Sequence, residues 1–232
     1  MPEKKKIIIN EPQKIYFAIF LVITIIVVLI FAFSTLGFFG SKWWTLSKIK
    51  NYYYNLAQQY SQNLPQVNAY DPLKGPVDAK ITIFEYSDFF CAACQQAQVD
   101  LTAIEKFYGT QVRFVYKGVA ATVNLEAKPA LTAAYCAAEQ NKFWEYKILL
   151  LQSPLLLNKQ KYLEYAGSLN LNLDLFNQCL QSDKYTSLIT QNLRDLMGWQ
   201  INTLPTIFVN EQLVPAPVNF NSIRAVIDSK LK

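Results

Sequence analysis

The chain has 232 residues, of which 52% are hydrophobic and 17% charged, and its mean hydropathy is +0.10. This composition excludes a disordered chain and is unusually poor in charge for an ordinary soluble domain. The formal net charge of +5 is too small to indicate nucleic-acid binding, and the lack of any histidine excludes Ser-His-Asp triads, Cys-His pairs and histidine-bound zinc or haem. The four cysteines are therefore the first candidates for chemistry.

The apolar excess comes mainly from one uncharged run, Ile15–Phe39. At about 1.5 Å per residue, a helix of this length crosses a hydrocarbon core roughly 30 Å thick, so we predict a transmembrane anchor in contact with membrane lipid over residues 15–39. A cleaved signal peptide is the alternative, but Trp43 and Trp44 are typical of a membrane interface and not of a cleavage site. Flanking lysines slightly favour a cytoplasmic N-terminus, residues 1–14, which places the C-terminal domain outside the cytoplasm.

Residues 40–70 carry apolar residues at roughly helical spacing and are predicted to form a stalk or linker. Prolines and a glycine then mark the start of a domain over residues 71–232. Its first strand is predicted over Ala79–Tyr86, which is rich in β-branched and aromatic residues, and its second over Gln111–Lys117. A helix ending near Tyr108 separates them, and this order predicts a parallel pair with a right-handed crossover.

The sequence Cys91-Ala92-Ala93-Cys94 stands between the first strand and this helix. At a helix N-terminus, the first sulfur lies near unsatisfied N–H groups and the positive end of the helix dipole, and both favour the reactive thiolate. The spacing lets Cys94 reach Cys91 and resolve a mixed disulfide. We predict a redox dithiol. A purely structural disulfide and half of a zinc site are the alternatives, and the lack of histidine and of a second close cysteine pair argues against zinc.

The rest of the domain is mostly helical before it returns to strands. One long helical stretch is predicted over Ala127–Leu151 and forms, with the helices after it, an all-helical insertion over about 127–198. Pro205 directly precedes a strand at Thr206–Asn210, a position at which a strand tolerates proline. The other predicted elements are helices over Lys159–Ser168, Leu173–Gln181 and Ser187–Met197, a strand over Gln212–Val214, and a helix over Ser222–Leu231.

Four segments of Asp71–Lys232 together resemble the DsbA-like thiol:disulfide oxidoreductases: IFEYSDFFCAAC, AAYCAAEQNKFWEY, FNQCLQSDKY and TLPTIFVN. The resemblance implies an α/β, thioredoxin-like fold with an all-helical insertion, and an enzyme whose catalytic cysteines are Cys91 and Cys94, with no cofactor and no metal. In this family the proline matching Pro205 is cis and faces the dithiol. The backbone before it binds the substrate strand, which assigns substrate binding to Thr203 and Leu204 within the Ile201–Leu204 segment.

The resemblance also assigns a catalytic role to Glu85, which matches an acidic residue buried beneath the active site that moves protons to or from the second cysteine. A desolvated carboxyl can exchange a proton with Cys94. A solvent-facing Glu85 is the alternative, and Lys117 is predicted to pair with it. Cys136 and Cys179 match positions at which related proteins often have cysteines. We expect a structural disulfide there, with two free buried thiols as the alternative.

These features together imply a membrane-anchored, extracytoplasmic thiol:disulfide oxidoreductase that acts on unfolded or reduced exported proteins and is reoxidised by a quinone-linked membrane partner. Two departures from the family leave the redox direction open. Ala92-Ala93 replaces the Pro-His of the strongly oxidising members, and Leu204 replaces the threonine common before the cis-proline. A disulfide reductase or isomerase is one alternative. The other is a non-catalytic tethered module that binds client proteins, against which the presence of both cysteines and Pro205 argues.

Overall fold

The computed structural model describes residues 20–28, 48, 64–121 and 124–232. The chain separates into two compact units, Met1–Ser61 and Gln62–Lys232. In the first unit, residues 20–28 are helical. Among the described residues, no helix has both the length and the apolar character needed to cross a membrane. The N-terminal residues 1–14, most of the predicted anchor and most of the predicted stalk lie outside the described residues, and these three assignments stay predictions.

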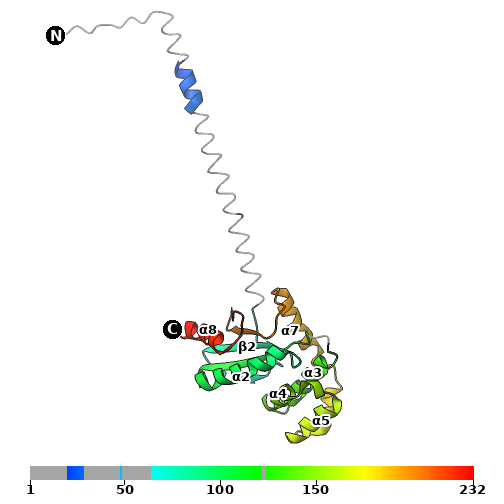
Figure 1. Cartoon of the computed structure of the whole chain (residues 1–232). Coiled ribbons are helices and arrows are strands. Elements are labelled where there is room, and N and C mark those ends of the chain that lie inside the picture. Colours follow the sequence, from blue (N-terminus) through cyan, green and yellow to red (C-terminus); the bar gives the residue numbers. More distant parts are fainter. Residues whose placement is uncertain (1–19, 29–47, 49–63, 122–123) are drawn as a thin grey trace, which may run out of the picture. The chain divides into compact units, whose positions relative to one another are not determined.

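A five-stranded sheet forms the centre of the second unit (Figure 1), with the strand order β1-β3-β2-β4-β5. The parallel pair expected from the sequence is confirmed: β2 and β3 are parallel and are joined through α2 (Ala92–Tyr108), whereas the other neighbours are antiparallel. All residues of β2 and β4 are buried, because both strands lie inside the sheet with its two faces covered. The strands are β1 (Leu73–Lys74), β2 (Ile81–Ser87), β3 (Val112–Gly118), β4 (Thr206–Val209) and β5 (Gln212–Leu213).

Helices cover both faces of the sheet. One face carries α2 and α8 (Phe220–Leu231), whose apolar side chains pack on Ile81 and Ile83 of β2. The other face carries α7 (Thr186–Gly198), which packs against Phe84 and Tyr86. Alternate residues of β2 therefore serve two separate cores, since successive side chains of a strand point to opposite faces.

Between β3 and β4 the chain forms five α-helices over residues 127–198, which end with α7. The helical stretch expected over Ala127–Leu151 is confirmed but is divided into two helices, because the chain turns at Asn141 and α3 and α4 pack against each other. Asn141 has a φ of 58°, a left-handed conformation that asparagine adopts more readily than most residues, so this turn needs neither glycine nor proline. The four helices before α7 are α3 (Ala127–Ala138), α4 (Phe143–Gln152), α5 (Lys159–Ser168) and α6 (Leu173–Leu180).

Gly118, the last residue of β3, is the point at which two helices of the insertion are fastened to the sheet. A Cβ atom at Gly118 would lie 2.4 Å from Leu131 Cδ2 and 2.9 Å from the Tyr135 hydroxyl, so any larger residue there would have to displace these side chains. The Gly118 N–H donates to the Tyr135 hydroxyl at 3.0 Å, and its carbonyl accepts a hydrogen bond from Asn192 Nδ2 at 3.0 Å. Tyr135 belongs to α3 and Asn192 to α7, so both helices are fixed to β3.

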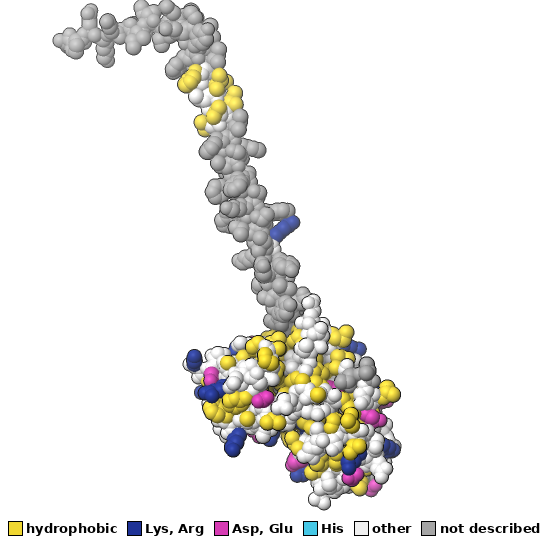
Figure 2. Space-filling model, viewed as in Figure 1, with side chains coloured by type: hydrophobic (Ala, Val, Ile, Leu, Met, Phe, Trp, Pro, Cys, Tyr) yellow, Lys and Arg dark blue, Asp and Glu magenta, His cyan; other side chains and the backbone are white. Residues whose placement is uncertain are grey.

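The surface of this unit mixes charged and apolar side chains. On the face shown in Figure 2, lysines and arginines are interspersed with acidic side chains and do not gather into one patch. Apolar side chains lie between them. That face therefore offers no concentrated charge of either sign.

Candidate active site

The two cysteines of the dithiol differ in their exposure. Cys91 is the N-cap of α2, and its Sγ accepts the N–H of Cys94 at 3.2 Å. The two sulfurs are joined in a disulfide, with the Cα atoms 5.2 Å apart. Cys91 is half-buried, whereas Cys94 is only 1% exposed. A thiol of another molecule can therefore reach the sulfur of Cys91 more readily than that of Cys94.

Asp88, which is fully buried, holds the turn between β2 and α2. Its Oδ1 accepts the N–H of Phe90 at 2.9 Å, its Oδ2 accepts the N–H of Ala121 at 3.2 Å, and its carbonyl accepts the N–H of Cys91 at 3.1 Å. Short acidic side chains often satisfy backbone groups of a turn in this way. These bonds place Cys91 at the first turn of α2, where unpaired N–H groups stabilise negative charge on its sulfur.

The loop before β4 faces the dithiol. The peptide bond between Leu204 and Pro205 is cis, as the family resemblance implied, and the Leu204 carbonyl oxygen lies 3.6 Å from Cys91 Sγ. Thr206 Oγ1 donates to the Thr203 carbonyl at 2.6 Å and so braces the loop. Thr203 is exposed, and Leu204 and Pro205 are half-buried. The fold thus brings two segments more than a hundred positions apart in sequence to one site.

Glu85 is buried on the α2 side of the sheet, with 2% of its surface exposed, so the solvent-facing alternative is excluded. The partner expected for it is wrong: Lys147 of α4 contacts its carboxylate at 2.5 Å, and Lys117 does not. Because Glu85 is in register with Tyr116 of β3, the adjacent Lys117 points to the opposite face of the sheet. There it contacts Asp71 at 2.5 Å.

Lys147 is buried among aromatic rings, and its Nζ lies 4.9 Å from the ring centre of Tyr116 and 5.3 Å from that of Trp144. Burial lowers the pKa of Lys147, and the negative charge of Glu85 opposes that shift. The sequence analysis missed this residue, although a signal exists. Lysine occupies one position of an apolar stripe at helical spacing, whose other members are Phe143, Tyr146 and Leu150.

Glu85 and Lys147 line a cavity of about 210 Å³ together with side chains of α2. One of these is Gln98, which lies about one helical turn after Cys94, so the cavity reaches the stretch of α2 that carries the buried sulfur. Glu105 also lines the cavity and contacts the half-exposed Lys74 at 2.6 Å. The arrangement offers a polar path between Glu85 and solvent, along which a proton can move.

An apolar groove of about 530 Å³, which the sequence analysis did not predict, lies beside the dithiol. Two of its side chains, Leu155 and Leu156, are 92% and 62% exposed. Large exposed apolar side chains next to a reactive group are typical of a binding surface. The full lining is Phe90, Ala92, Gln95, Gln152, Ser153, Pro154, Leu155 and Leu156.

A protein-family model described as thioredoxin matches residues 68–229, which is more than half of the chain. The chain belongs to this thioredoxin family. The cis-proline loop facing the disulfide lies within the matched region, as do the buried Glu85 and the whole helical insertion. Residues 68–229 are called the thioredoxin domain below.

Solved structures share the fold of the thioredoxin domain at low sequence identity. A thioredoxin-like oxidoreductase from Silicibacter pomeroyi DSS-3 has a TM-score of 0.62 and 20% identity, covering 70% of this chain and 92% of that one. The thiol-disulfide exchange protein alpha-DsbA2 from Wolbachia pipientis has a TM-score of 0.65 and 13% identity, covering 74% and 92%. Oxidised BdbD from Bacillus subtilis has a TM-score of 0.63 and 19% identity, covering 72% and 96%. The thioredoxin domain therefore has the same fold as these three proteins.

The curated relatives of the thioredoxin domain are much longer proteins. Na(+)/H(+) antiporter NhaA 3 from Salinispora tropica is 34% identical over 160 residues, which are 68% of this chain and 24% of the relative. NhaA 1 from Salinispora arenicola is 31% identical over 160 residues, with the same two shares. The chain thus spans about a quarter of the length of these relatives, and the match concerns one part of each.

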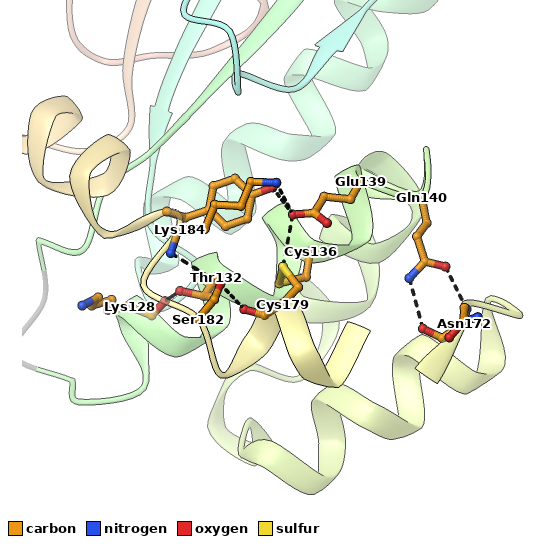
Figure 3. Close-up of a disulfide and its surroundings, with 10 residues drawn as sticks. Lys128, Thr132, Cys136, Glu139, Gln140, Asn172, Cys179, Ser182 and Lys184 are labelled. Atoms are coloured by element: carbon orange, nitrogen blue, oxygen red, sulfur yellow. Dashed lines mark hydrogen bonds and ion pairs between the residues drawn. A yellow bond between two sulfur atoms is a disulfide. The ribbon is translucent and has the colours of Figure 1, made fainter. Parts of the chain in front are cut away.

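A second disulfide joins Cys136 of α3 to Cys179 of α6, with the Cα atoms 5.7 Å apart (Figure 3), as the family resemblance implied. Glu139 lies beside it, and its Oε1 accepts hydrogen bonds from Lys184 at 2.8 Å and from Tyr185 at 2.7 Å. Burial raises the pKa of Glu139, but these two bonds outweigh burial and hold the pKa below its usual range. This disulfide connects two helices of the insertion. It is separate from the Cys91–Cys94 disulfide, of which Cys91 is half-buried and Cys94 buried.

Proposed function

We propose that the thioredoxin domain is a thiol:disulfide oxidoreductase that is anchored in the cell membrane and acts on unfolded or reduced proteins outside the cytoplasm. One observation carries the proposal: half-buried Cys91 caps α2, is bonded to buried Cys94, and lies 3.6 Å from the Leu204 carbonyl before a cis-proline. A reactive sulfur, a resolving sulfur and a backbone edge for a second chain are thus together at one site.

In the oxidising direction, a thiolate of the substrate attacks the sulfur of Cys91. The Cys91–Cys94 bond breaks, a mixed disulfide forms, and Cys94 leaves as a thiolate. Cys94 then takes up a proton that reaches it from solvent by way of the buried Glu85–Lys147 pair. A second substrate thiolate then attacks the substrate sulfur of the mixed disulfide and releases Cys91. The substrate loses two electrons and two protons, and the domain is left as the dithiol.

The substrate is a flexible polypeptide rather than a small thiol. Its backbone lies along Thr203 and Leu204, and an apolar side chain near its cysteine occupies the groove at Leu155 and Leu156, next to Ala92. Such contacts bind unfolded chains of many sequences, because backbone and apolar groups are common to all of them. Repeated oxidation requires a partner that accepts two electrons from the dithiol, and we assign this role to a quinone-linked membrane protein.

Exchange assays with cysteine variants test the proposal. The full chain should oxidise a reduced client protein and catalyse the reduction of insulin by dithiothreitol, and Cys91→Ser should abolish both activities. Cys94→Ser should trap a mixed disulfide with the client, visible on non-reducing gels, because the resolving thiol is missing. The double variant Cys136→Ser/Cys179→Ser is the matched control, and it should retain exchange activity under conditions in which it is folded.

The two assays also separate the competing functions. If the chain reduces insulin faster than it oxidises the reduced client, it is a reductase. If it rearranges the disulfides of a scrambled client without net oxidation, it is an isomerase. If the wild-type chain catalyses neither reaction and Cys94→Ser traps no client, the domain is a binding module, and the oxidoreductase proposal is wrong.

A further inference from the structure

On the face of the sheet away from Glu85, a second buried ion pair joins Asp71 to Lys117. Asp71 Oδ2 lies 2.5 Å from Lys117 Nζ, and neither side chain is more than 1% exposed. The other carboxylate oxygen, Asp71 Oδ1, is buried and accepts no hydrogen bond from the described residues. Among the described residues, Lys117 Nζ contacts only this one carboxylate oxygen, although an ammonium group has three N–H donors. The pair therefore leaves one buried acceptor, Asp71 Oδ1, and buried N–H donors of Lys117 without hydrogen bonds.

Two further buried polar atoms without a hydrogen-bond partner among the described residues belong to the same region. One is the hydroxyl of Tyr86, the residue of β2 that is in register with Lys117. The other is Asn192 Oδ1, whose amide nitrogen donates to the carbonyl of Gly118, next to Lys117. The negative charge of Asp71 also acts on the Tyr86 hydroxyl, which places these groups within electrostatic reach of each other. Asp71, Tyr86, Lys117 and Asn192, which carry four of the five such atoms in the described part of the chain, are thus linked through these contacts.

The four groups match one another chemically. Lys117 and the Tyr86 hydroxyl can donate hydrogen bonds, and Asp71 Oδ1 and Asn192 Oδ1 can accept them. A buried polar group left without a partner costs about 1–3 kcal/mol, so Asp71 Oδ1, the Tyr86 hydroxyl and Asn192 Oδ1 would together destabilise the fold considerably. The charges of Asp71 and Lys117 cancel, so an additional cation or anion would carry an uncompensated charge into the interior. A water molecule accepts two hydrogen bonds, donates two and is neutral.

We propose that Asp71, Tyr86, Lys117 and Asn192 form a binding site for internal water, in which at least one molecule bridges the two donors to the two acceptors. Asp71 also lines a surface cleft of about 710 Å³, so the site lies close to solvent although the Asp71 side chain is buried. The water joins three parts of the fold: the segment entering the domain, which carries Asp71; strands β2 and β3; and α7, which carries Asn192. Tyr86 also packs edge-on against Trp199, so the site adjoins the segment leading to the cis-proline loop.

The direction in which one conservative substitution changes the unfolding equilibrium constant tests this site. If water satisfies the Tyr86 hydroxyl, Tyr86→Phe removes a hydrogen bond and should raise the unfolding equilibrium constant of the full chain roughly 2- to 10-fold. If the hydroxyl is unsatisfied, the same change removes a buried penalty, and the constant should stay equal or fall. Tyr146→Phe is the matched control, since the buried Tyr146 hydroxyl donates directly to the Tyr162 carbonyl at 2.9 Å and its loss must destabilise.

A crystal structure of the full chain provides the second measurement. We expect electron density for an ordered water within hydrogen-bond distance of Asp71 Oδ1 and of at least one of Tyr86, Lys117 and Asn192. Both results together sustain the proposal. Either an unfolding constant for Tyr86→Phe that is no larger than that of the wild type, or a well-resolved map without this water, overturns it.

Discussion

Two lysines of the thioredoxin domain have buried ammonium groups, and each pairs with a carboxylate on a different face of the sheet. Lys147 pairs with Glu85 on the α2 side, and Lys117 with Asp71 on the other. Removing one partner of a buried pair leaves a charge without compensation, which is far more costly than breaking a surface pair. A single substitution should therefore lower the free energy of unfolding more when it breaks a buried pair than when it breaks a surface pair.

For Lys147→Met we expect a loss of about 3–5 kcal/mol in the free energy of unfolding, because Glu85 keeps a buried charge without its partner. The double variant Glu85→Gln/Lys147→Met should recover much of this loss, since neither charge remains. Lys142→Met is the matched control, because Lys142 directly precedes α4, the helix that carries Lys147. It breaks a half-exposed contact with Glu145 (3.0 Å) and should cost less than about 1 kcal/mol. Urea denaturation measures all three, and equal losses for Lys147→Met and Lys142→Met would contradict the prediction.

Ala92 and Ala93 determine how strongly the reduced dithiol is favoured. Neither side chain has a charge or a hydrogen-bond donor, so the thiolate of Cys91 is stabilised mainly by the N-terminus of α2. We expect a reduction potential between those of thioredoxin, about −270 mV, and DsbA, about −120 mV. Ala93→His adds a donor and should raise the potential by tens of millivolts, where about 30 mV is a tenfold change in the equilibrium constant.

Equilibration with glutathione buffers measures this potential. Ala93→Gln is the control for size and polarity without charge, and its shift should be smaller than that of Ala93→His. A wild-type potential as high as about −120 mV would show that some other group stabilises the Cys91 thiolate. The lack of a charge or donor at Ala92 and Ala93 would then not be what limits the reduction potential.

At the scale of elements, the helical insertion depends on the Cys136–Cys179 bridge and on the turn at Asn141. The turn folds α4 back onto α3, which places Lys147 over Tyr116 and Glu85. The bridge ties α3 to α6 and closes a loop of 43 positions. Because α3 is also fixed to Gly118 of β3, the bridge holds the insertion together at the point where it meets the sheet.

Cys136→Ala/Cys179→Ala should lower the free energy of unfolding by about 3–4 kcal/mol in the chain-entropy model. The control Cys91→Ala/Cys94→Ala removes a bridge between residues only three positions apart and should cost less. In graded reductant followed by alkylation and mass spectrometry, the buried Cys136–Cys179 bridge should open after Cys91–Cys94. Two free thiols at positions 136 and 179 in aerobically purified protein would refute this assignment.

At the scale of the whole molecule, the chain joins a strongly apolar N-terminal run to the thioredoxin domain. The run Ile15–Phe39 has no charged residue and is long enough, as a helix, to reach across a bilayer. The domain that follows contains two disulfides, which persist in oxidising compartments and rarely in the cytosol. Both observations support the same proposed topology.

We therefore expect the full chain to stay in the membrane fraction after carbonate extraction, and a reporter fused after Lys232 to be active only outside the cytoplasm. A truncated chain beginning at Ser41 is the control and should be found in the soluble fraction. Recovery of a soluble mature form of the full chain that starts near Ser41 would mean that the run is a cleaved signal peptide.

The sequence by itself determined those parts of the protein that depend on local pattern. The β-branched and aromatic composition of the first strand, the helix-start geometry and the CAAC motif placed β2, the dithiol and α2 in the right order, and the resemblance added Pro205 and the second disulfide. Periodicity reports which face of an element is buried, and it does so from neighbouring residues alone. The burial of Glu85 was implied by the resemblance instead, because every residue of β2 is buried and periodicity does not distinguish the two faces of this strand.

Only the tertiary structure decided which buried charges meet. Lys147 and Glu85 lie 62 positions apart, and their contact depends on a turn at Asn141 that has no glycine or proline to mark it. The strand register then turned Lys117 away from Glu85 and toward Asp71, since a shift of one residue in a strand reverses the face of the sheet. The apolar groove at Leu155 and the proposed water site arise in the same way, from side chains of separate elements that become neighbours only when the helices pack on the sheet.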